Sequence, residues 1–178
     1  HHSIDDINVM RGIPNMLVVS PSDPVMVDWL VRTLIDDYKG PAYVSISRSG
    51  AGDVYAQGES FTLGRAKEVR DGKDATVFAY GLSVARAAKA AEALEAEGIS
   101  VRVCDMFTIK PLDRQAVVDA ARRTGAIVTV EEHSIIGGLG SAVAEVLAEE
   151  GIAVPFTRVG IRDCFTESGS YDQLVEHF

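Results

Sequence analysis

Strand-like and helix-like segments alternate along most of this chain, and that alternation limits its fold more than any other feature. Short apolar or β-branched runs predict strands at residues 16–20, 42–47, 74–80, 101–106, 126–130 and 156–159. Helical patterns follow at residues 24–38, 84–97, 114–124, 137–150 and 171–177. Strand–helix–strand repetition with short connections favours right-handed crossovers and a mainly parallel sheet. The sequence therefore predicts an α/β protein with helices on both faces of its sheet.

The alternation is complete only in the later part of the chain. From Asp74 onward, four strands and four helices suffice for a three-layer αβα domain with a mainly parallel sheet. Residues 1–47 provide only two strands and about two helices, and an open two-stranded sheet buries too little apolar surface to fold well alone. We interpret residues 1–60 as a partial α/β domain that ends in a glycine-rich linker at 49–64, and residues 61–178 as the second domain.

Local signals predict how the early helices begin. Asp23 and Pro24 are the residue types preferred at an N-cap and at the first helical position. Ser3 and Asp6 have the spacing of a capping box with a shortened acid. The helix after Pro24 is expected to bury one face that consists of Val27, Leu30, Val31, Leu34 and Ile35.

Composition argues against several classes of function. The formal net charge of −9 argues against a duplex nucleic-acid binder, because nothing would neutralise phosphates in bulk. Two cysteines, Cys104 and Cys164, cannot form a disulfide framework or a four-cysteine zinc site. No apolar run approaches the ~20 residues of a membrane span, and no signal peptide opens the chain. A buried, reduced Cys104 fits a cytoplasmic location.

Arg48 is the first candidate binding residue. It follows a predicted strand and precedes Ser49 and Gly50. Ligands of parallel α/β sheets bind beyond the carboxyl ends of the strands, and a guanidinium there can hold a phosphate with two parallel hydrogen bonds. The alternative is a solvated surface arginine, which the residues alone favour.

A second candidate is the turn that opens the helix at 137–150. Exposed amides in the glycine-rich run 137–141 could bind an anion, but a tight turn that needs glycine for close packing is the favoured interpretation. The run does not match a dinucleotide-binding fingerprint. Glu131 and Glu132 just before it point to opposite sides of a strand, so their spacing does not make them an acid/base pair. The histidines show no metal-ligand spacing apart from the adjacent His1 and His2.

Seven stretches, taken in order, resemble the C-terminal third of transketolases. They are residues 1–6 (HHSIDD) with 10–15 (MRGIPN), 20–23 (SPSD), 46–48 (ISR), 108–113 (TIKPLD), 129–133 (TVEEH), 137–143 (GGLGSAV) and 163–169 (DCFTESG). Each motif is modest, but their order and spacing are specific to the family. The resemblance covers essentially the whole chain.

This resemblance implies a function and a division of the chain. Transketolases move a two-carbon ketol unit between sugar phosphates with thiamine diphosphate and a divalent cation, Mg or Ca. Residues 1–60 resemble the C-terminal half of the pyrimidine-binding domain with its linker, and residues 61–178 resemble the transketolase C-terminal domain. The implied partners are an N-terminal transketolase segment or subunit and sugar phosphates, in a homodimer.

The resemblance also implies two site residues. His1 matches the family's histidine that hydrogen-bonds sugar oxygens at the reacting centre and helps proton transfer. Arg48 matches the arginine that binds the substrate phosphate. The family's catalytic glutamate, its ring-stacking aromatic residue and its diphosphate and metal ligands all lie upstream of His1. We therefore expect no cofactor to bind this chain alone, and we expect the isolated fragment to be inactive. The resemblance assigns no chemical role to His133 or to the turn at residues 137–141.

Other interpretations remain open. The chain could belong to a related thiamine enzyme, such as 1-deoxyxylulose-5-phosphate synthase or the β subunit of a 2-oxo acid dehydrogenase, which share the sheet and the P-L-D step. It could also be a non-catalytic subunit-association module. The motifs TIKPLD at residues 108–113 and EEH at residues 131–133 favour transketolase.

Overall fold

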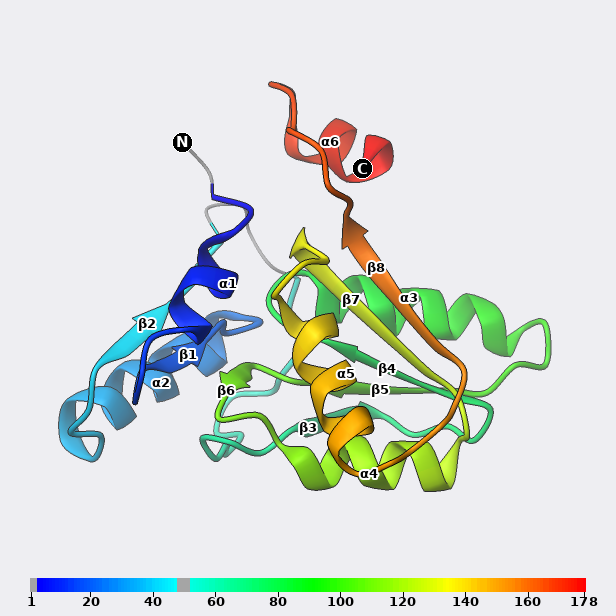
Figure 1. Cartoon of the computed structure of the whole chain (residues 1–178), viewed down its shortest axis with the longest axis horizontal. Coiled ribbons are helices and arrows are strands. Elements are labelled where there is room, and N and C mark those ends of the chain that lie inside the picture. Colours follow the sequence, from blue (N-terminus) through cyan, green and yellow to red (C-terminus); the bar gives the residue numbers. More distant parts are fainter. Residues whose placement is uncertain (1–2, 48–51) are drawn as a thin grey trace.

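The computed structural model describes residues 3–47 and 52–178, which form two sheets (Figure 1), and one core cluster contains residues of both. The elements in chain order are α1 (Asp6–Arg11), β1 (Leu17–Val19), α2 (Pro24–Asp36), β2 (Ala42–Val44), β3 (Lys67–Arg70), β4 (Ala75–Ala79), α3 (Ser83–Glu95), β5 (Val101–Asp105), β6 (Thr108–Lys110), α4 (Arg114–Arg123), β7 (Ile127–Ser134), α5 (Leu139–Glu149), β8 (Phe156–Ile161) and α6 (Tyr171–His177).

The larger sheet has the predicted three-layer architecture. Its strand order is β3-β5-β4-β7-β8, and the three pairings among β4, β5, β7 and β8 are parallel. Phe78 of β4 packs in a cluster with Val117 of α4 and Val143 of α5, while the adjacent Ala79 packs with Val84 of α3. Successive strand residues point to opposite faces, so α3 covers one face and α4 and α5 cover the other. The α/β prediction is confirmed.

The smaller sheet corrects the prediction of two open strands in the first segment. Its order is β2-β1-β6, so the short strand β6, which follows β5, pairs with β1 in antiparallel orientation. All three residues of β1 are buried, and both of its edges are paired. Neither β6 nor the antiparallel edge strand β3 was predicted. The first is only three residues long, and the second has the polar sequence KEVR, so neither carries an apolar strand signal.

The predicted linker contributes to the core. Tyr55 and Phe61 are buried and belong to a cluster with Leu17 of β1, Met26 of α2 and Phe107. Their rings pack edge to face, with centroids 4.8 Å apart. A glycine-rich composition indicated a loop but gave no sign that two aromatic side chains in it fill a gap between the sheets. The predicted domain boundary near residue 60 stays a prediction.

Two further local expectations need correction. Along α2, Leu30 is buried as expected, but Val31 and Ile35 are 48% and 70% exposed, because no described element packs on that side of the helix. At α1, the Ser3 hydroxyl donates to the Asp5 carboxylate at 2.7 Å and does not cap the helix. The predicted cap at Asp23 is confirmed, since its carboxylate accepts the Met26 amide at 2.8 Å.

Among the described residues, no helix is long and apolar enough to cross a membrane.

Candidate functional site

The two predicted site residues, His1 and Arg48, lie outside the described residues, but the segments beside them are described and meet. The Asp6 carboxylate at the start of α1 accepts hydrogen bonds from the Tyr43 hydroxyl at 2.5 Å and from the Ser45 hydroxyl at 3.3 Å. Burial, reinforced by Asp6, raises the pKa of Tyr43 to about 12, so this phenol stays a donor at neutral pH. The segment that follows His1 is thereby tied to the strand that leads to Arg48.

The carboxyl end of β1 adjoins this contact. β1 and β2 are parallel, so the residues after both strands gather at one end of the small sheet. Ser20, Ser22 and Asp23 follow β1 there and are buried. This is the end of a parallel sheet at which α/β proteins bind ligands.

The glycine-rich turn before α5 is occupied by the protein itself. The buried Glu131 carboxylate accepts the Leu139 amide at 2.7 Å and the Gly140 amide at 2.8 Å. Burial raises the pKa of Glu131, and the two amides oppose that rise. Because these donors are already paired, the turn is a packing feature and not a site for an external anion, as the favoured interpretation held. Glu132 lies on the other side of the strand and accepts from the Tyr171 hydroxyl.

Sequence reasoning missed a buried polar cluster between the two sheets. The Tyr55 hydroxyl donates to Asp105 Oδ2 at 2.8 Å, and Asp105 is completely buried at the end of β5. Asp23, besides capping α2, accepts the amides of Val54 and Tyr55 at 3.1 and 2.8 Å. The only signal in the sequence was the N-cap role of Asp23. The contacts of Asp23 with the linker could not be predicted, because they depend on residues 54 and 55 folding back against the start of α2.

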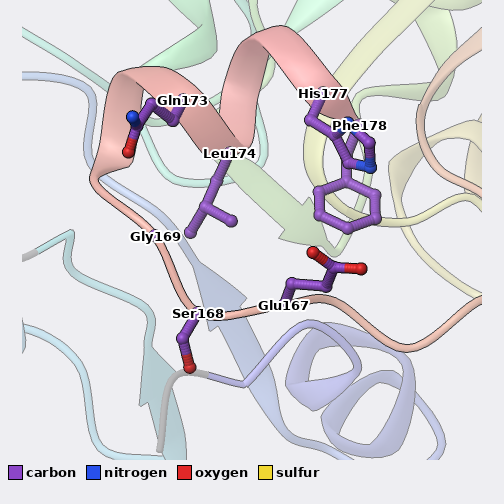
Figure 2. Close-up of a pocket in the computed structure, with 7 residues that line it drawn as sticks. All are labelled: Glu167, Ser168, Gly169, Gln173, Leu174, His177 and Phe178. Carbon is purple, nitrogen blue, oxygen red and sulfur yellow. The ribbon is translucent and has the colours of Figure 1, made fainter.

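A cavity of about 270 Å³ lies near the C-terminus between α6 and the loop before it (Figure 2). Its wall includes the Glu167 carboxylate, and it has no lysine or arginine that would hold a phosphate. Figure 2 shows Leu174 of α6 pointing toward the loop at Gly169. The cavity therefore does not fit a sugar phosphate or the diphosphate of a cofactor.

A divalent cation needs several ligand side chains gathered at one place. Residues 3–47 and 52–178 contain no group of three or more His, Cys, Asp or Glu side chains that could hold a metal ion. These residues therefore offer no set of ligands that fits a divalent cation.

Comparison with known protein families defines the class. The family model described as "Transketolase, C-terminal domain" matches residues 64–178, and "Transketolase, pyrimidine binding domain" matches residues 1–52. The chain belongs to the transketolase family. Members of this family depend on thiamine diphosphate.

Individual relatives resemble the chain over its whole length. It is 43% identical to the "6-deoxy-6-sulfo-D-fructose transketolase subunit SqwH" of Clostridium sp. (strain MSTE9), covering 100% of this chain and 55% of that protein. It is 42% identical to the "Putative transketolase C-terminal section" of Methanocaldococcus jannaschii, with 100% and 56% covered. It is 40% identical to the 1-deoxy-D-xylulose-5-phosphate synthase of Syntrophotalea carbinolica, with 100% and 28% covered.

A solved structure agrees with the fold. The chain is 46% identical to a protein described as "Split gene transketolase, inactive beta4 tetramer", with a TM-score of 0.95 over 99% of this chain and 57% of that one. The chain spans just over half the length of this protein and of the two transketolase relatives, and about a quarter of the synthase. The roles of His1 and Arg48 remain predictions.

Proposed function

We propose that this chain is the C-terminal portion of a thiamine-diphosphate-dependent transketolase, which transfers a two-carbon ketol unit between sugar phosphates. The observation that carries the proposal is the match of the whole chain, at 46% identity and a TM-score of 0.95, to a split-gene transketolase chain. Relatives described as transketolase subunits or sections, at 42 and 43% identity, support the same activity.

Within this function we assign two roles. His1 hydrogen-bonds the oxygens of the sugar at the reacting centre and moves a proton there. Arg48 holds the phosphate of the substrate through its planar fork of N–H donors. The contact of Asp6 with Tyr43 and Ser45 supports a shared site. It joins the segment that follows His1 to the segment that precedes Arg48.

We also propose that an N-terminal transketolase segment or subunit completes the site and supplies the ligands of the cofactor and its Mg or Ca ion. Strand β2 is paired along one edge only among the described residues, and Val31 and Ile35 on the outer side of α2 are exposed. Further polypeptide packed on this side would cover both features. We place the complete enzyme in the cytoplasm as a homodimer, and the buried free thiol of Cys104 is consistent with that compartment.

Reconstitution tests the proposal. The full-length subunit, combined with its N-terminal partner, thiamine diphosphate and Mg²⁺, should transfer ketol units between pentose phosphates in a coupled assay. Arg48→Ala should raise KM for phosphorylated substrates by about 10–100-fold, since a charge-assisted hydrogen bond contributes roughly 1.5–3 kcal/mol.

The matched control is Arg32→Ala, which removes an exposed arginine paired with Asp28 on α2. It should leave KM unchanged. An unaltered KM in Arg48→Ala would remove the assignment of that residue and leave the transketolase proposal standing.

A second candidate activity is that of 1-deoxyxylulose-5-phosphate synthase, favoured by the 40% identity to the Syntrophotalea carbinolica enzyme. The same reconstituted protein should then consume pyruvate, and it should not use a ketose phosphate as donor. An assembly that turns over neither donor would support the alternative of a non-catalytic association module.

A further inference from the structure

Helix α1 directly follows the segment that carries His1, and its start lacks a cap of its own. Asp5 occupies the N-cap position without a side-chain hydrogen bond to the helix. The first amides of any helix need acceptors from outside it. One of them, the Asn8 N–H, donates to Nε2 of His133 at 3.4 Å, although 125 positions separate the two residues.

His133 is held so that this nitrogen is an acceptor. The side chain is buried, 1% exposed, and its Nδ1 lies 2.6 Å from the Ser134 carbonyl oxygen. A carbonyl oxygen can only accept, so Nδ1 carries the proton and Nε2 keeps its lone pair for Asn8. The Ser134 amide in turn donates to the Ile4 carbonyl at 2.7 Å, three positions after His1. Two adjacent residues of β7 thus bind both Ile4 and the first turn of α1.

One glycine allows α1 to approach this turn closely, and the next leaves room for the Glu131 carboxylate. A Cβ atom at Gly137 would lie 1.9 Å from Asn8 Oδ1, and a Cβ at Gly138 would lie 2.0 Å from Glu131 Oε2. A side chain at Gly137 would have to displace the Asn8 side chain, whose Cβ would also lie only 2.8 Å away. The Glu131 carboxylate, which binds the amides at the start of α5, packs directly beneath the turn.

The end of α1 is fastened to the same domain. The Arg11 guanidinium donates to the Gly137 carbonyl at 2.8 Å and to Glu145 at 2.6 Å, and only 16% of its side chain is exposed. Lys110 Nζ donates to the carbonyl oxygens of Arg11 and Ile13 at 2.8 and 2.6 Å, which satisfies acceptors at the helix end. The C-terminal domain therefore holds both ends of α1.

We propose that His133, Gly137 and Arg11, together named the α1 clamp, position the segment that carries His1 for ketol transfer. This inference rests on the proposed function for the role of His1, whereas the clamp itself rests on the contacts above. It makes the C-terminal domain a positioning element of the reacting centre. His133 is a positioning residue in this proposal, because its side chain contacts α1 and acts on His1 through that helix.

The kinetic test compares two substitutions of His133 in the reconstituted enzyme. His133→Leu removes the acceptor for Asn8 and should lower kcat by about 10–100-fold, the range expected when a catalytic group is misplaced by roughly 1 Å. KM for phosphorylated substrates should stay within about twofold, because the strand before Arg48, β2, is held by its pairing with β1 and not by the clamp residues. His133→Gln places an amide oxygen near the Nε2 position and should restore most of kcat. His177→Ala, which removes an exposed histidine, is the control and should behave like the unmodified enzyme.

A double-mutant cycle with His1→Ala separates positioning from general damage. If the clamp acts through His1, His133→Leu should lower kcat less than about threefold further in the His1→Ala background. Fully multiplicative losses, or a His133→Gln variant as impaired as His133→Leu, would overturn the proposal.

Hydrogen exchange measured by mass spectrometry tests the clamp independently of turnover. His133→Leu should speed exchange in peptides that cover residues 3–12 and leave those covering α6 unchanged, with His133→Gln intermediate. Unchanged exchange at residues 3–12 would exclude the clamp. Faster exchange in a protein without ketol transfer would support the clamp and count against the proposed function.

Discussion

At the scale of single residues, Asp105 is the most unusual group in the described structure. It is completely buried, and burial raises its pKa to about 7, against the opposing effects of the nearby Ser22 hydroxyl and of the hydrogen bond from the Tyr55 hydroxyl. The nearby Asp23 carboxylate raises it further. A carboxyl that titrates near neutrality at the junction of the two sheets makes the stability of the fold depend on pH.

The sign of that dependence follows from the two pKa values. The folded value of about 7 lies above the ordinary value of 3.8, so the folded state binds this proton more tightly. The contribution to stability therefore falls as pH rises from 3.8 to about 7, and the full penalty of the buried charge persists above that. We expect Asp105→Asn to be nearly neutral near the low end of this window and stabilising, on the order of a few kcal/mol, above its upper end.

Urea unfolding at several pH values checks this. The stability difference between Asp105→Asn and the unmodified chain should grow with pH. The exposed Asp119, which accepts from Gln115 on α4, provides the control, because Asp119→Asn changes the same charge without burial. A difference for Asp105→Asn that stays constant with pH would contradict the assignment.

At the scale of secondary-structure elements, two aspartates cap helices and also fasten loops. Asp23 caps α2 and accepts two linker amides, and Asp113 caps α4 while its other oxygen accepts the Ala66 amide at 2.9 Å. A carboxylate has lone pairs for several donors, so one side chain can fix a helix start and a remote loop together. These helices begin where the fold also joins distant segments.

Asp23→Ala should therefore destabilise the chain more than loss of a cap alone. A helix cap contributes about 0.5–2 kcal/mol, and leaving the buried Tyr55 amide unpaired adds about 1–3 kcal/mol, whereas the half-buried Val54 amide can turn to water. We expect a total loss of roughly 2–5 kcal/mol in chemical denaturation. Ser170→Ala, which removes the exposed cap of α6, should lose about 1 kcal/mol or less. Equal losses in the two variants would show that the linker contacts of Asp23 contribute nothing.

At the scale of the whole molecule, the two sheets are interlocked. After β5 the chain crosses from the larger sheet to the smaller one, where β6 pairs with β1 (Figure 1). The core cluster that contains Phe78 of β4 also contains Ile7 of α1 and Val18 of β1. The linker crosses back to bury Phe61 against Phe107. Neither sheet can lose its packing without exposing apolar surface of the other.

We expect the chain to unfold in a single cooperative transition. Calorimetry should give one peak whose van't Hoff enthalpy equals the calorimetric enthalpy. Phe107→Ala, at the contact between the sheets, should lose about 3–5 kcal/mol and move the whole peak to lower temperature. Two peaks, with only one of them moved by Phe107→Ala, would contradict the interlocked core.

Four strands of the larger sheet and the helices between them could be predicted from the sequence because their signals are local. The apolar run of β4 and the alanine-rich pattern of α3 each lie within a dozen residues, and periodicity reports which residues face the core. The exposure of Ile35 escaped prediction for the same reason. Periodicity identifies an apolar face, but whether another element covers that face depends on what packs beside it.

The candidate site residues were predicted from a family resemblance and not from local sequence signals. His1 and Arg48 were selected by a resemblance to transketolases, since the residues alone favoured a surface arginine at position 48. The sequence did not predict that His133 would bind α1. This binding depends on a contact between His133 and Asn8, which lie 125 positions apart. No local pattern encodes which amide a buried imidazole will meet.

The sequence by itself determined the α/β class, the helices and all strands of the larger sheet except β3, and the family, because propensity, periodicity and motif spacing are properties of neighbouring residues. Only the tertiary structure decided that β6 joins β1, that Glu131 occupies the turn before α5, and that the C-terminal domain holds both ends of α1. Each of these depends on unpaired backbone groups finding partners far along the chain, and burial makes such pairing obligatory without specifying the partner in the local sequence.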